Sequence, residues 1–159
     1  MRNKTFGFSL VEMLVVSVIM MIFITVSSLA YSQIRDQQDL KMAAKEVVAT
    51  LYEAKQLAFY GKKPASCQNN NYNYNGNEIR LSSTTIYVYA VCNNSNNYYS
   101  IKTLRLKGGV RMSFAPNAHP FTFSTLNGET NLSAPKIIRL RSPNGRTSTI
   151  TITQIGEIQ

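Results

Sequence analysis

The sequence has very few of the residues on which enzymes and metal sites depend. Among its 159 residues there are one histidine and two cysteines, too few for a zinc site of the common Cys/His type. The only aspartates, Asp36 and Asp39, fall in a predicted helix, and no P-loop, dinucleotide fingerprint or nucleophile elbow is present. His119 has no companion histidine, and we interpret it as a loop residue. We therefore expect no enzyme, no metal, no cofactor and no small-molecule substrate.

Charge and helix-breaking residues are absent from one long stretch. Charged residues make up 16% of the chain, below the usual ~25%. Residues 13–30 contain no charge, and residues 8–60 contain neither glycine nor proline. After Gly61 the chain becomes rich in Asn, Thr, Ser and Tyr. The length suits one domain of ordinary size, while the uneven distribution argues against a uniform soluble enzyme and excludes a multi-pass membrane protein.

The apolar N-terminal stretch predicts a membrane helix. Arg2 and Lys4 precede it, and the positive-inside rule keeps that end in the cytoplasm and exports the rest. As a helix, residues 8–30 would measure ~35 Å, enough for a hydrocarbon core of ~30 Å. A cleaved secretory signal ending near residues 28–30 and a plain signal anchor are the alternatives. Neither explains Glu12, whose carboxylate costs about 2–3 kcal/mol inside a bilayer.

The segment around Glu12 resembles a known signal. Gly7 is followed by Phe-Ser-Leu-Val-Glu and an apolar run, which resembles the class III signal of type IV prepilins and pseudopilins. The resemblance implies that a prepilin peptidase removes residues 1–7 by cleaving between Gly7 and Phe8, and that Phe8 is then N-methylated. It also implies that Glu12 meets the N-terminal amine of a neighbouring subunit during filament assembly. Other pilin subunits, the peptidase and the membrane are the expected partners.

One difference narrows this resemblance. Many major pilins carry glycine or proline in the middle of the N-terminal helix, whereas residues 8–60 contain neither. We therefore expect an unbroken helix and a minor pilin or pseudopilin.

Residues 31–60 predict an amphipathic continuation of the helix. Apolar side chains recur three and four positions apart, which is one helical stripe; they are Leu40, Ala44, Val47, Leu51, Ala54 and Ala58. Most are small, which favours packing against a globular head; the alternative, a coiled coil, would have under three heptads. Gly61 predicts the end of the helix, and Pro64 prevents its resumption.

Residues 61–159 predict a β-rich head. Short β-branched and aromatic runs separated by turn signals indicate strands, at residues 86–92, 99–106, 110–114, 121–126, 136–141 and 147–155. The Asn- and Tyr-rich segments 68–77 and 93–99 predict loops. A long helix on an antiparallel sheet or small β-sandwich gives an α+β, pilin-like fold. The last strand, with Ile150, Ile152 and then Gly156, resembles that of GspH/FimT-type minor pilins.

The two cysteines, Cys67 and Cys92, fall in the part predicted to be exported. Cysteine pairs outside the cytoplasm usually form disulfides, so we expect a bond that ties the segment after the helix to a strand. The chain-entropy argument gives it roughly 3–4 kcal/mol of stability. Two free buried thiols are the alternative.

Positive charge is concentrated in the head. Residues 61–159 contain eleven Lys and Arg residues and three Glu, a net charge of +8. A basic surface attracts polyanions such as DNA with salt-dependent affinity. Arg139 and Arg141 share one face of a predicted strand, and the candidate contacts are Lys136, Arg139, Arg141 and Arg146. A second basic cluster comprises Lys102, Arg105, Lys107 and Arg111.

Some FimT-like minor pilins capture DNA through arginines near the C-terminus, whereas here Gly156 is followed by Glu157. Two main hypotheses stay open: a structural filament subunit, and a filament-borne receptor for DNA or an adhesin. An anchored enzyme is a third, and it would require a polar pocket with perturbed titratable groups.

Overall fold

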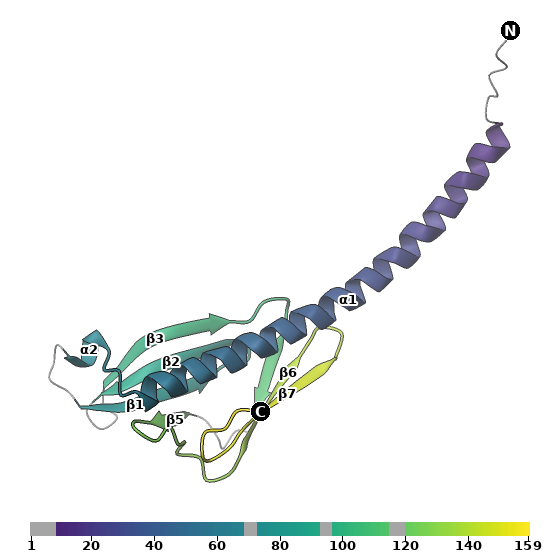
Figure 1. Ribbon diagram of the computed structural model, residues 1–159. Coiled ribbons are helices and arrows are strands. Elements are labelled where there is room, and N and C mark those ends of the chain that lie inside the picture. Colours follow the sequence, from purple (N-terminus) through teal and green to yellow (C-terminus); the bar gives the residue numbers. More distant parts are fainter. Residues whose placement is uncertain (1–8, 69–72, 93–96, 115–119) are drawn as a thin grey trace, which may run out of the picture. The chain divides into compact units, whose positions relative to one another are not determined.

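The computed structural model describes residues 9–68, 73–92, 97–114 and 120–159, without the side chains of residues 26–30, 66 and 97 (Figure 1). His119 lies outside the described residues. The helices are α1 (Leu10–Phe59) and α2 (Ala65–Gln68). The strands are β1 (Tyr74–Leu81), β2 (Thr85–Cys92), β3 (Asn97–Arg105), β4 (Arg111–Phe114), β5 (Phe121–Ser124), β6 (Lys136–Arg141) and β7 (Thr147–Ile152). The chain divides into two units within α1, Met1–Arg35 and Asp36–Gln159.

The first unit carries the N-terminal end of α1. The Ser9 hydroxyl accepts a hydrogen bond from the Glu12 amide at 3.2 Å, the N-cap interaction that satisfies one free donor of the first turn. Large apolar side chains from Leu10 to Ile24 are exposed in this unit. In the residues that the structure describes, no helix is long and apolar enough to cross a membrane. The assignment of residues 8–30 to a membrane stays a prediction from the sequence.

The second unit combines the C-terminal part of α1 with two antiparallel sheets. One sheet has the strand order β3-β2-β1-β5 and the other has the order β4-β6-β7. β6 and β7 form a hairpin whose turn is closed by a hydrogen bond from the Ser142 amide to the Arg146 carbonyl. The predicted α+β fold, a long helix packed on antiparallel sheets, is confirmed (Figure 1).

Residues of α1 form a core with the inner faces of both sheets. The predicted stripe is buried except at Ala44, which is partly exposed, while Ala43 is 4% exposed. Val47, Leu51 and Ala58 are fully buried. They pack with side chains from both sheets, including Ile79, Ile86, Phe121, Phe123, Ile138, Leu140, Ile150 and Ile152. Small residues on this stripe let the helix lie close to the strands.

The structure corrects the loop predicted at residues 68–77, because β1 begins at Tyr74. The Asn77 side chain is buried and donates to the Ala54 carbonyl of α1 at 2.8 Å, while accepting from the Tyr74 hydroxyl at 2.7 Å. Gly76 has a φ of 132°, and a Cβ there would collide with the Phe123 carbonyl of β5. Tertiary contacts thus override the low strand propensity of Asn and Gly. The loop predicted at residues 93–99 is also corrected, because β3 begins at Asn97.

Cys67 of α2 and Cys92 at the end of β2 form a disulfide with a Cα–Cα distance of 5.9 Å. Both are fully buried and pack with Ala90, Tyr74 and Tyr99 in a second, smaller apolar cluster. Burial raises the pKa of the Tyr74 hydroxyl. The disulfide predicted between these residues is present, and it fastens the segment after α1 to the four-stranded sheet.

Candidate functional site

The N-terminal candidate residues are described only in part. Gly7 and Phe8, the predicted cleavage and methylation positions, lie outside the described residues. Glu12 is at the third helical position of α1 and is exposed. The positive end of the helix dipole favours a carboxylate there. Among the described residues, no cationic side chain forms an ion pair with Glu12.

The helix around Glu12 presents an apolar surface on every side. Its large apolar side chains from Leu10 to Ile24 are between 47% and 82% exposed. A helix that is apolar all round is normally buried, in a protein core or in a membrane. Among the described residues of this unit, nothing covers these side chains. The segment therefore has the chemistry of an intermolecular or membrane contact.

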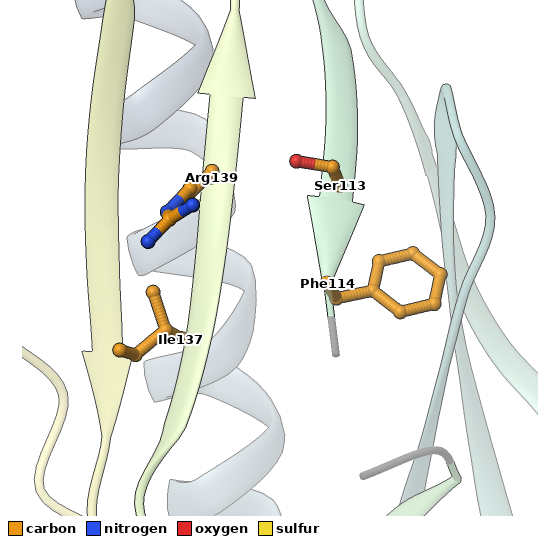
Figure 2. Close-up of a pocket in the computed structure, with 4 residues that line it drawn as sticks. All are labelled: Ser113, Phe114, Ile137 and Arg139. Atoms are coloured by element: carbon orange, nitrogen blue, oxygen red, sulfur yellow. The ribbon is translucent and has the colours of Figure 1, made fainter. Parts of the chain in front are cut away.

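The second candidate site is the outer face of the three-stranded sheet. β6 alternates strictly between buried and exposed residues, which places Arg139 and Arg141 outward. In the register of β4 with β6, Arg111 lies opposite Arg141 and Ser113 lies opposite Arg139. Figure 2 shows Arg139, Ile137, Ser113 and Phe114, which line a shallow hollow of about 330 Å³ on these two strands.

Arg146 follows β6 in the chain but is not part of its outer face. It is exposed in the β6–β7 turn, where its carbonyl accepts from the amide of buried Ser142, so it lies opposite Ser142 and not opposite Arg139 or Arg141. Like charges directly opposite each other across strands destabilise a sheet, as Arg111 and Arg141 do here. The ion pairs found among the described residues lie elsewhere: Arg80–Glu78 is on β1 of the other sheet, and Lys102–Glu53 joins β3 of that sheet to α1. We name the exposed set Arg111, Arg139 and Arg141 the arginine face.

Lys136 does not belong to this face, and the prediction that it contacts a polyanion is wrong. It is 1% exposed because the alternation of β6 places it on the buried side with Ile138 and Leu140. Its ammonium nitrogen lies 4.8 Å from the ring centroid of Phe121 and 5.6 Å from that of Phe114. It has no hydrogen-bond partner within the described part of the chain. Burial lowers the pKa of Lys136 to about 8.

The second predicted basic cluster is divided by the fold. Lys102 of β3 pairs with Glu53 of α1, and Arg111 belongs to the arginine face. The position of Arg111 opposite Arg141 could not be predicted, because opposition between strands depends on register. In the described ranges, no group of three or more His, Cys, Asp or Glu side chains could hold a metal ion.

Residues 2–28 match the family described as the prokaryotic N-terminal methylation motif. No curated protein and no solved structure matches the chain. The match covers the predicted leader, the cleavage position, Glu12 and the first part of α1, and it supports a type IV pilin-like or pseudopilin-like subunit that is processed by a prepilin peptidase and assembles with other pilins.

Proposed function

We propose that this protein is a minor pilin or pseudopilin of a type IV pilus or a type II secretion-like filament. Residues 1–7 are removed, Phe8 is methylated, and residues 8–30 hold the subunit in the cytoplasmic membrane with the head outside until assembly. The observation that carries the proposal is the methylation motif at residues 2–28. The exposed apolar surface of α1 and the α+β fold support it.

In this proposal the Glu12 carboxylate forms an ion pair with a neighbouring subunit. In the first unit the backbone amide of Glu12 donates to the Ser9 hydroxyl. The Glu12 carboxylate is exposed and has no ion-pair partner among the described residues. Within a packed apolar filament core an isolated carboxylate is costly, and a cationic partner greatly reduces that cost. The N-terminal amine of a neighbouring processed subunit is such a partner, since cleavage would create it four residues before Glu12.

The test is to follow processing and assembly separately in the producing cell. Mass spectrometry of the mature N-terminus should find methylated Phe8, and Gly7→Ala should slow or block loss of the leader. Glu12→Gln should be processed normally but enter the filament at least tenfold less, because the ion pair is lost. Glu46→Gln, which changes an exposed glutamate in the second unit, is the matched control. Normal incorporation of Glu12→Gln would refute the role of Glu12, and an intact leader in the wild type would refute the proposal.

The arginine face favours a second function, in which the filament-borne head binds DNA. Three exposed arginines that lie without carboxylate partners among the described residues produce a positive field on one face. Guanidinium groups match the geometry of phosphates. An adhesin for another polyanion, or a basic face that lies against acidic subunits, is the competing interpretation.

A salt titration tests whether the arginine face binds DNA. The full chain in lipid nanodiscs is titrated with double-stranded DNA at several salt concentrations, and should bind with a log–log salt slope of about −0.9 for each phosphate neutralised. Replacing Arg111, Arg139 and Arg141 by Gln should reduce affinity at least tenfold and flatten the slope. Lys136→Gln is not a suitable control because the side chain is buried, so exposed Lys62→Gln is used. Equal binding by the triple variant would exclude this face as a DNA site.

A further inference from the structure

The outer edge of β7 is only partly used for hydrogen bonding. β7 pairs with β6 on one side. On the other side, Thr151 exchanges two backbone hydrogen bonds with Gln159, at 2.8 and 2.9 Å. Because outward-pointing backbone groups recur at every second residue of a strand, those of Thr149 and Thr147 point to the same side. Within the described residues these groups have no hydrogen-bond partner.

A groove lies next to this free edge. It has a volume of about 350 Å³ and is lined by Ala44, Lys45, Val48, Ala49, Ser148, Thr149, Ile150 and Gln159. The α1 side presents mainly small apolar side chains, and the β7 side presents the free backbone. Gln159 stands at the groove and already pairs with β7 in the manner of an added strand. The next residues of such a strand would run along Thr149 and Thr147.

The charges around the edge indicate which side chains an added strand would carry. Thr149 lies opposite Arg139 and Thr147 lies opposite Arg141 in the register of β6 with β7. Residues of an added strand opposite these threonines would point to the outer face, two strand spacings (~10 Å) from the arginines. Acidic side chains suit these positions. The residue between them would point inward to Ala44 and Val48, where a small apolar side chain fits.

We propose that an extended segment of a neighbouring subunit, alternating acidic and small apolar side chains, adds to the free edge of β7 beside Gln159. Backbone hydrogen bonds to Thr149 and Thr147 would provide the attachment, as in other cases of β-strand addition. The arginine face and the apolar groove would select the sequence. The proposal rests on the proposed function only in assigning the segment to another filament subunit.

The test uses the full chain in lipid nanodiscs and a fluorescent peptide of alternating valine and glutamate as the probe. The peptide should bind, more weakly as salt increases, and a peptide of alternating valine and lysine should bind at least tenfold more weakly. Thr149→Pro removes the outward amide, which an edge strand tolerates, and should reduce binding at least tenfold. Thr149→Val keeps that amide and should bind like the wild type.

A second variant changes the α1 side of the groove. Ala44→Leu fills the groove without altering the edge of β7, and it should weaken binding to a similar extent. Amide hydrogen exchange of β6 confirms that each variant is folded. No binding of the acidic peptide, equal binding of the lysine peptide, or unchanged binding by both folded variants would overturn the proposal. These outcomes are independent of leader removal and Glu12, so they are distinguishable from failure of the proposed function.

Discussion

The two parts of α1 differ in the exposure of their apolar side chains. In the first unit, apolar side chains surround the helix and stay exposed, with Leu14 at 58%. In the second unit, apolar residues form one stripe that is buried against both sheets, with Leu51 at 0%. One helix thus contains a part whose apolar stripe is buried in the core of the second unit and a part whose described apolar side chains are exposed. Apolar residues of the first part are available for intermolecular contacts, in a membrane or among other helices.

Matched leucine substitutions test this division most strongly. Leu51→Ala should reduce the free energy of unfolding of the head by about 2–5 kcal/mol, because it removes buried methyl groups and leaves a cavity. Leu14→Ala makes the same chemical change where the side chain is exposed, and should alter that free energy by less than about 0.5 kcal/mol. Denaturant unfolding of the full chain in detergent, monitored by tyrosine fluorescence, measures both values.

The division would be wrong if the two variants lost equal stability. A further readout separates their roles, since Leu14→Ala should affect filament entry while Leu51→Ala should affect the level of folded protein.

The disulfide gives the next largest effect, and it also belongs to the second unit. Cys67→Ser should cost roughly 3 kcal/mol, because the Cys67–Cys92 bond closes a loop with a sequence separation of 25 residues. Reductant should destabilise the wild type by a similar amount and leave Cys67→Ser unchanged. Comparison of denaturant midpoints with and without reductant checks both statements. Helicity of residues 10–35, followed by amide exchange, should not change; a loss there would show that the head supports the first part of α1.

The sequence was sufficient for features set by local pattern and insufficient for those set by pairing. The helical stripe and the alternation of β6 follow from the periodicity of apolar residues. β1 could not be predicted, because Gly76 and Asn77 have low strand propensity and are accommodated by contacts with β5 and α1. The placement of Arg111 opposite Arg141 depends on register, which no local signal specifies.

The surface position predicted for Lys136 was wrong. The alternation that exposes Arg139 and Arg141 also buries every second residue of β6, and Lys136 is one of these. The charge of its side chain led to a surface assignment that this alternation contradicts. The rings of Phe114 and Phe121 form part of the environment that accommodates its stem and ammonium group. Because the Lys136 ammonium group is buried, the stability of the head should depend on pH.

Lys136→Met should stabilise the head at neutral pH by about 1–3 kcal/mol, because each pKa unit of depression costs 1.36 kcal/mol in the charged form. The pKa is about 8 in the folded protein against 10.5 normally. Between these values the unfolded chain binds more protons, so wild-type stability rises with pH through this window. The advantage of Lys136→Met should therefore be greatest below pH 8 and vanish above about pH 10.5. Urea unfolding of both proteins at pH 7, 9 and 10.5 measures it, with Lys62→Met as the exposed control. A constant difference across this range would show that the Lys136 ammonium group is not desolvated in the folded protein.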